Sequence, residues 1–167
     1  MTMETGRLQS RMIAHAGLVL LLGMVCGFPF AFNLLGRIEL WPLPGVGVTI
    51  PGTERAWRAA HIGNIMNGTM LLAVAAVFHR LTLAPGLRRA VALCLIVTVW
   101  GNAIFYVMAA GFTTGRGLTF GANQYGGGDW FNAIAYLAAM LAVFTVIAAL
   151  VLVVRGALAS ARNATSD

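Results

Sequence analysis

Four long apolar runs, separated by more polar segments, set the pattern of the chain. The runs cover approximately residues 12–35, 57–78, 87–111 and 130–154. Each is long enough to cross about 30 Å of hydrocarbon, which takes about 20 helical residues. Because the runs are continuous and lack the period-two alternation of membrane strands, they predict helices and not a barrel. The pattern therefore predicts an all-α integral membrane four-helix bundle, with residues 1–167 as a single domain.

The connections between the runs predict how neighbouring helices are arranged. The second connection is short and ends in Pro85-Gly86, which predicts that the second and third helices form an antiparallel pair. The first and third connections, residues 36–56 and 112–129, are longer and fall on the opposite membrane face. Long loops on one face often cover a site, so these two are candidates for that role.

Composition and charge agree with a membrane protein and predict its orientation. Hydrophobic residues make up 59% of the chain and charged residues 10%, whereas a soluble domain is about a quarter charged. All 11 cationic residues are arginines, and most of them fall on the side of the termini and the short connection. The positive-inside rule therefore predicts cytoplasmic termini. We expect a multi-pass protein of the bacterial inner membrane. The basic pI follows from this topology, so no nucleic-acid partner is expected.

Polar side chains in the second run are the first candidates for function, because polar groups in lipid are costly and usually face the bundle interior or a cavity. His61, Asn64 and Gly68 recur at steps of three and four residues, which puts them on one helical face. Asn67 is rotated toward the neighbouring edge. By itself, His61 fits a metal ligand and a structural histidine equally well. Intramembrane asparagines also commonly hydrogen-bond another helix without any chemistry attached.

The third run adds a second polar face. Asn102 and Tyr106 are four residues apart and share it, with Trp100 nearby. The two aromatic residues also fit packing or interface positions. In the first run, the spacing of Gly23 and Gly27 allows close contact with another helix.

Residues 116–129 of the third connection are too polar and too rich in glycine to be a span, yet they carry two aromatic residues and a single arginine, Arg116. Their glycines permit backbone close to a partner surface or at positive φ. A flexible tether would favour serine and glycine alone. The threonine, asparagine, glutamine and aromatic side chains therefore predict an ordered loop.

Acidic residues are missing from the apolar runs, and Asp129, at the edge of the fourth, is the one candidate. Proton pumping by carboxylates, paired-carboxylate hydrolysis and a multi-acid metal site are therefore hard to build. The sequence also lacks a Walker motif and a Rossmann glycine pattern. Chemistry in this chain needs an imported electrophile, which a haem with one histidine ligand would supply.

At these residues the sequence resembles the styrene oxide isomerases, which are small four-span membrane enzymes. The similarity runs over nearly the whole chain, and the string in the third connection is its most specific part. The motifs that carry it are Arg58-Ala59-Ala60-His61 with Asn67-Gly68, Trp100-Gly101-Asn102 with Phe105-Tyr106, and Arg116-Gly117-Leu118-Thr119-Phe120-Gly121 with Asn123-Gln124, Gly126 and Gly128-Asp129.

The resemblance implies an isomerase that converts small aryl epoxides such as styrene oxide to aldehydes such as phenylacetaldehyde, by a Meinwald rearrangement. It implies haem b as the cofactor, with ferric iron acting as a Lewis acid on the epoxide oxygen before a 1,2-hydride shift. It also implies a homotrimer with the haem near subunit interfaces.

The same resemblance implies roles for individual residues. His61 is the axial ligand of the iron, Asn67 and Tyr106 position the epoxide, and Asn102 supports them. At Thr98 the chain departs from the family, which has an acidic residue there, and this leaves the electrostatics of the site open. The further residues expected to contact the cofactor are Asn64, Trp100 and Arg116.

Three alternatives use the same residues. A hydroxylaminobenzene mutase has a similar histidine–asparagine helix but rearranges an N-aryl hydroxylamine. A b-type electron carrier needs a second histidine ligand, which His15 or His79 would have to provide. In a structural subunit without a cofactor, His61 and the asparagines only join helices.

Overall fold

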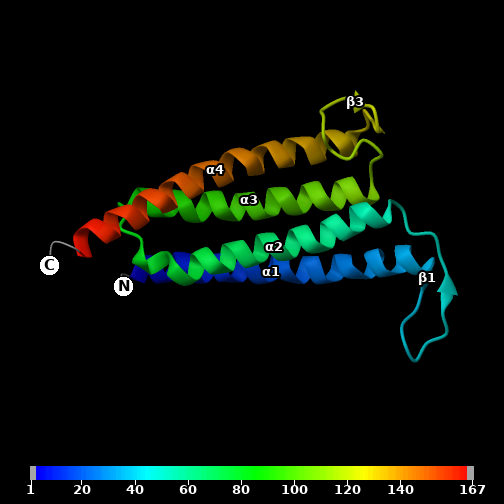
Figure 1. Cartoon of the computed structure of the whole chain (residues 1–167), viewed down its shortest axis with the longest axis horizontal. Helices are drawn as coiled ribbons and strands as arrows, with labels where there is room; N and C mark the ends of the chain where they lie inside the picture. The colour runs from blue at the N-terminus through cyan, green and yellow to red at the C-terminus, as the bar shows by residue number, and fades with distance from the viewer. Residues whose placement is uncertain (1–2, 165–167) are drawn as a thin grey trace.

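The computed structural model describes residues 3–164 of the chain. It contains four helices that are long and apolar enough to cross a membrane (Figure 1). They are α1 (Met3–Leu35), α2 (Glu54–Val77), α3 (Pro85–Gly111) and α4 (Trp130–Ala164), and a 3-10 turn, η1 (Phe78–Arg80), continues α2. Each predicted apolar run corresponds to one of these helices, so the prediction of four membrane-spanning helices is confirmed.

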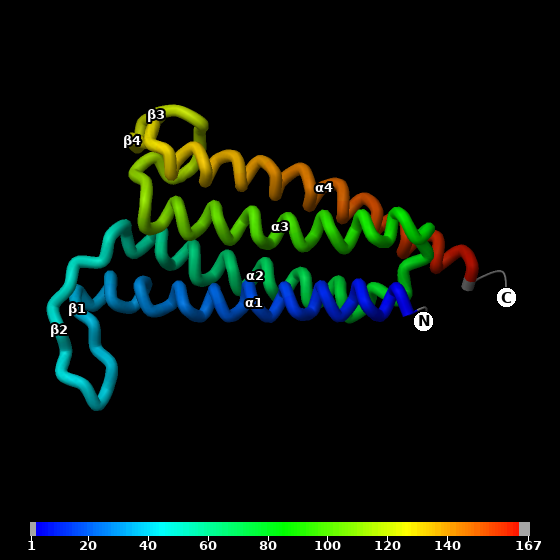
Figure 2. The backbone as a smooth tube through the Cα atoms, turned by 180° about the vertical axis from the view of Figure 1, so that it is seen from behind, coloured from blue at the N-terminus to red at the C-terminus, as the bar shows by residue number. Residues whose placement is uncertain are grey.

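The helices lie in the order α1, α2, α3, α4 across the molecule (Figures 1 and 2). α1 packs along α2, α3 packs along α4, and α2 joins the two pairs by packing on α3. The two ends of the described chain lie at the same end of the molecule as the short α2–α3 connection. Both long connections lie at the opposite end, which we call the loop-side end. The predicted antiparallel α2–α3 pair is confirmed; the cytoplasmic location of the termini stays a prediction.

The packing differs from a closed four-helix bundle, because α4 contacts α3 far more than it contacts any other helix. α4 is apolar on all sides, and large side chains such as Leu137, Phe144 and Ile147 are more than half exposed on it. A helix that is hydrophobic on every face is found in a protein core or in a membrane. Such an outward surface is suited to lipid or to another subunit.

Glycines bring the helix backbones close together. A Cβ atom at Gly23 would come within 3.0 Å of the backbone nitrogen of Ile65 on α2. At Gly101 of α3, a Cβ would come within 2.8 Å of the Ala138 carbonyl oxygen on α4. Small residues at such positions permit the close approach that stabilises helix pairs in lipid. The close contact predicted from Gly23 and Gly27 is confirmed, since both glycines face α2.

Two short hairpins form part of the long connections. β1 (Arg37–Ile38) pairs with β2 (Val46–Gly47) between α1 and α2. β3 (Ala122–Asn123) pairs with β4 (Gly126–Gly127) between α3 and α4. The second hairpin projects beside the start of α4, above the ends of the helices (Figure 2).

Candidate functional site

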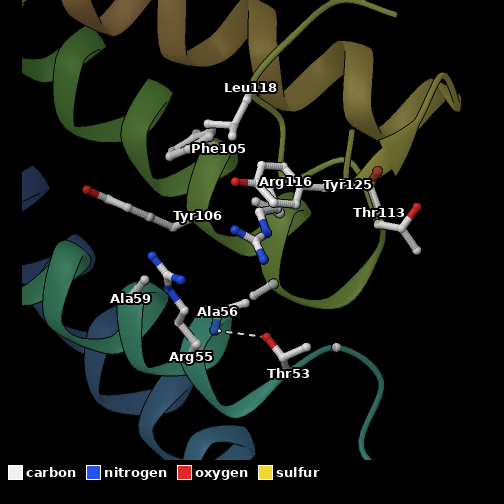
Figure 3. Close-up of a pocket in the computed structure, with 14 residues that line it drawn as sticks. Thr53, Arg55, Ala56, Ala59, Phe105, Tyr106, Thr113, Arg116, Leu118 and Tyr125 are labelled. Carbon is white, nitrogen blue, oxygen red and sulfur yellow. Dashed lines mark hydrogen bonds between the residues drawn. The ribbon is translucent and has the colours of Figure 1, made fainter. Parts of the chain in front are cut away.

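A cavity of about 640 Å³ opens at the loop-side end of the molecule. It lies between the start of α2, the end of α3 and the α3–α4 loop (Figure 3). Its volume is in the range of small-molecule sites, about 300–1,000 Å³. We call it the loop-side cavity. The lining residues used below are Arg55, Ala56, Ala59, Phe105, Tyr106, Arg116, Leu118 and Tyr125.

Tyr106 reaches from α3 to the wall of α2 inside this cavity. Its ring packs on the backbone of Gly63, where a Cβ atom would lie only 2.5 Å from two ring carbons. Among residues 3–164, no hydrogen-bond partner is found for the Tyr106 hydroxyl. The phenol is therefore held in place by its ring while its O–H stays free to bind a ligand. Gly63 is not among the residues predicted from the sequence, although a glycine two residues from His61 in a membrane helix is a signal of close packing.

We expect Gly63→Ala to disturb Tyr106 directly, because the added methyl group and the ring cannot occupy the same space. Overpacking of this kind costs about 1–3 kcal/mol of stability, and the ring must move away from its position. The measurement is thermal unfolding together with turnover of the purified protein. Gly17→Ala on α1 is the matched control, since a Cβ there meets nothing within 4 Å. Equal unfolding temperatures and equal turnover of Gly63→Ala and Gly17→Ala would contradict the proposed packing of Tyr106 on Gly63.

Asn67 and Asn102 hydrogen-bond each other directly between α2 and α3. Asn102 Nδ2 donates to Asn67 Oδ1 at 2.8 Å, and Asn67 Nδ2 donates to the Gly63 carbonyl at 2.7 Å. These two bonds fix the orientation of the Asn67 carboxamide and leave one of its N–H groups for another acceptor. The face predicted for Asn102 and Tyr106 is confirmed, because both side chains meet α2.

His61 packs against α1 instead. Its Nδ1 lies 2.8 Å from the Gly23 carbonyl oxygen, and its ring stacks on Phe30 with 6.3 Å between ring centroids. A carbonyl can only accept, so Nδ1 carries a proton and donates it to Gly23; in the neutral imidazole the lone pair is then on Nε2. A backbone carbonyl commonly orients metal-binding imidazoles in this way. Gly27 provides room for the ring, since a Cβ there would come within 3.1 Å of Nδ1.

Asn64 accompanies His61 on the side of α2 that meets α1. Asn64 is fully buried, and its Nδ2 donates to the Ala60 carbonyl at 2.8 Å and lies 4.0 Å from Cys26 Sγ. Its Oδ1 is buried without a hydrogen-bond partner in the described part of the chain. Gly68 also faces α1, because a Cβ there would meet the Leu20 side chain. The predicted common face of His61, Asn64 and Gly68 is confirmed.

The predicted residues of α2 therefore form two groups on different sides of the helix. His61 and Gly63 are two residues apart, which is about 200° around an α-helix. The His61 imidazole meets α1, whereas the Tyr106 phenol lies on Gly63 at the opposite side. His61 does not line the loop-side cavity. The His61 imidazole and the Tyr106 phenol of one chain therefore cannot contact the same small ligand.

Trp100 lies apart from both groups. Its Nε1 donates to Nδ1 of His15 at 3.1 Å, which joins α3 to α1. Gly23, the partner of His61, is eight residues beyond His15 along α1, a distance of about 12 Å. His15 and His61 therefore lie along different parts of α1, and in this structure the Nδ1 of His15 is occupied by the Trp100 bond.

Thr98 faces α4 and not the candidate site. It is buried, its hydroxyl donates to the Cys94 carbonyl at 2.8 Å, and it lies 2.8 Å from the Thr145 hydroxyl. The threonine therefore satisfies its polar group within the α3–α4 pair. In this chain it contributes to helix packing.

Arg116 occupies an unusual backbone position in the α3–α4 loop. Its φ is +60°, a region that side chains other than glycine seldom adopt. The guanidinium lies over the Tyr125 ring, 3.8 Å from the ring centroid, and lines the loop-side cavity. Holding such a residue in this conformation requires support from the surrounding structure.

Asn132, at the start of α4, supplies much of this support. It is fully buried, its Oδ1 accepts from the Gly117 N–H at 2.9 Å, and its Nδ2 donates to the Thr119 carbonyl at 2.7 Å. Asp129 in turn accepts from the Asn132 backbone N–H and from the Thr113 hydroxyl, both at 2.7 Å. The Thr113 bond, followed by the backbone bond, holds the pKa of the Asp129 carboxyl below its ordinary value. These contacts confirm the predicted ordered loop, although the role of Asn132 was missed.

Removing the Asn132 carboxamide should loosen the loop. We expect Asn132→Ala to lower the free energy of unfolding by about 1–3 kcal/mol, because buried loop groups lose their partners. Gln124→Ala in the same loop is the control, since Gln124 is exposed. Limited proteolysis of the loop and thermal unfolding would measure the difference. Identical protection of both variants would argue against the network.

The chain is similar to known proteins of one kind. A family model described as styrene oxide isomerase matches residues 8–158. A curated protein from Pseudomonas fluorescens, named styrene-oxide isomerase, is 32% identical over 133 residues, which cover 80% of this chain and 78% of that protein. The range matched by the family contains His61, Asn67, Asn102 and Tyr106, and so both sides of α2.

Proposed function

The chain belongs to the styrene oxide isomerase family and is an isomerase, and we propose that it converts styrene oxide and related aryl epoxides to aldehydes in the bacterial inner membrane. The observation that carries this proposal is the family match, which extends over residues 8–158. The four membrane-spanning helices agree with it, because small aryl epoxides are apolar and partition into a bilayer.

His61 is the residue that would hold the haem b of this proposal. Its Nδ1 is engaged by the Gly23 carbonyl, so Nε2 is the ring nitrogen available to ligate a metal. The stacked Phe30 ring and the close approach of Gly27 hold the imidazole in place. Bound there, the haem would supply a ferric Lewis acid to the epoxide oxygen.

Tyr106 and Asn67 would position the epoxide and stabilise its oxygen. Negative charge develops on that oxygen as the benzylic C–O bond breaks, and a free phenol O–H can donate to it. Asn67 has one N–H beyond its bond to Gly63, and Asn102 fixes its orientation. A hydride then moves from the neighbouring carbon to the benzylic carbon. The aldehyde contains every atom of the epoxide, so no water and no external base is consumed.

Apolar walls would protect this reaction from water. Ala56, Ala59, Phe105 and Leu118 line the loop-side cavity next to Tyr106. Water that reached the benzylic cation would capture it as a diol. Walls of this kind exclude water and strengthen the hydrogen bonds that remain.

We further propose that the protein acts as a homotrimer whose sites are shared between neighbouring chains. His61 and Tyr106 lie on opposite sides of α2, so a haem held by His61 would meet the Tyr106 cavity of the next chain. The outward surfaces of α1 and α4 carry large exposed apolar side chains, such as Leu21, Phe28 and Phe144, which a neighbouring chain can cover. This arrangement would put the haem near the subunit interface.

A direct assay separates this function from the alternatives. Purified protein in detergent is incubated with styrene oxide or with phenylhydroxylamine, and the products are identified by chromatography. We expect phenylacetaldehyde from the epoxide and no rearranged product from the hydroxylamine. The reverse result would identify a hydroxylaminobenzene mutase instead.

A further inference from the structure

The loop-side cavity carries positive charge that the proposed reaction does not use. Arg55 and Arg116 both extend into it, from α2 and from the α3–α4 loop (Figure 3). No carboxylate lines the cavity, and within residues 3–164 neither arginine has an ion-pair partner. Two guanidinium groups that face one cavity repel each other, and this repulsion is relieved when an anion lies between them. A neutral epoxide and a neutral aldehyde cannot do this.

The loop holds Arg116 in this place at a conformational cost. Its backbone has a φ of +60°, and its guanidinium is stacked on Tyr125 at 3.8 Å. The buried carboxamide of Asn132 accepts the N–H of the next residue, Gly117, at 2.9 Å. Both Arg116 and Arg55 are exposed, but an unsupported arginine would adopt an ordinary backbone conformation. The loop therefore fixes the backbone from which Arg116 reaches the cavity.

The cavity also has the right location for an amphipathic anion. It lies at the loop-side end, beside the first turn of α2, where ionised groups remain in contact with water. Its wall is partly apolar, with Ala56 and Ala59 on α2 and Phe105 on α3 lining it beside the two arginines. A ligand with an apolar body and an acidic edge would match both parts.

We propose that Arg55 and Arg116 together bind the propionate carboxylates of the haem. The proposal rests on the function proposed above, because that function requires haem b, which has an apolar ring and two carboxylates on one edge. Guanidinium groups bind carboxylates through paired N–H donors, so two arginines suit two propionates. In the trimer proposed above, the edge of a haem held by His61 of a neighbouring chain would then lie in the same cavity as the Tyr106 phenol. Arg55 is thereby assigned to cofactor binding, and Arg116 receives a defined partner.

The test compares haem b with its dimethyl ester, in which both propionates are esterified and uncharged. Full-length protein produced under haem limitation is titrated with each compound, and binding is followed by the Soret band. We expect the wild-type protein to bind haem b at least about tenfold more tightly than the ester, since hydrogen bonds to charged groups have this size. In the double variant Arg55→Gln/Arg116→Gln, the ratio of the affinity for haem b to the affinity for the ester should fall to near unity. The affinity for the ester should stay unchanged.

Arg37→Gln provides the matched control. Arg37 lies in the other long connection at the same end of the molecule, where it pairs with Glu39 at 2.7 Å. This variant removes the same charge outside the cavity and should keep the full preference for haem b. Arg55→Lys/Arg116→Lys, which retains the charge, should keep part of it.

Three outcomes would overturn the inference. They are equal binding of haem b and the ester by the wild type, a preserved preference in the double glutamine variant, and a lost preference in Arg37→Gln. Equal binding of both compounds would leave His61 ligation and the isomerase function standing. If the wild type bound neither compound, the haem of the proposed function would fail as well.

Discussion

His61→Ala is expected to abolish both haem binding and isomerase activity, the largest effect of any substitution in the chain. The variant loses the imidazole whose Nε2 would ligate the iron, together with its Nδ1–H bond to the Gly23 carbonyl and its packing on Gly27. Without the Lewis acid, the rate should fall by at least about 10³-fold, because metal polarisation of the oxygen is worth several kcal/mol. The measurements are the Soret absorbance per chain and the turnover of styrene oxide.

His79→Ala is the control for this experiment. His79 lies at the far end of α2, in η1, and is exposed. Its loss should change neither haem content nor rate. A His61→Ala protein that remained folded and kept normal turnover would refute the assignment of His61.

Tyr106→Phe should have the second largest effect, with a different signature. The ring can still pack on Gly63, so the variant should fold and retain haem. Only the O–H donor is lost. Removing one donor to a developing oxyanion lowers kcat by about 10²–10³-fold in other enzymes, and we expect a loss of this order with little change in KM.

Tyr136→Phe on α4 is the corresponding control, since this tyrosine lies outside the loop-side cavity. It should turn over styrene oxide at the normal rate. Full activity of Tyr106→Phe would mean that the phenol takes no part in the reaction, and the oxygen would then need another donor.

The helices could be predicted from the sequence, but their arrangement could not. Four continuous apolar runs are enough to predict four spans. A continuous apolar segment of about 20 residues can cross the bilayer only as a helix, because a helix pairs all its backbone N–H and C=O groups internally. The position of α4 depends on which surfaces fit together. Nothing in its uniformly apolar sequence distinguishes a side that packs on α3 from a side that meets lipid.

The site was predictable where helical periodicity governs it. Spacing alone put Asn64 with His61, and Asn102 with Tyr106, and the structure confirms both pairs of neighbours on their faces. Spacing cannot tell which helix each face meets, so the separation of His61 from Tyr106 was not foreseen. Gly63 was missed because its contribution is the absence of a side chain.

Residues whose role depends on the α3–α4 loop were the hardest to predict. Asn132 follows the loop in the sequence, and its buried bonds to Gly117 and Thr119 depend on a chain reversal that no local pattern specifies. Arg55 is likewise an ordinary helix residue in the sequence. It acquires significance only when the fold brings it to the same cavity as Arg116.

The central claim is that an iron porphyrin held by His61 opens the epoxide ring. It is tested most directly by the absorption spectrum of the detergent-purified protein, recorded before and after addition of styrene oxide, with phenylacetaldehyde measured in the same cuvette. The account predicts a Soret band that shifts when the epoxide is added, and a rate proportional to haem content across partly loaded preparations. A colourless preparation that forms the aldehyde at the full rate would contradict it.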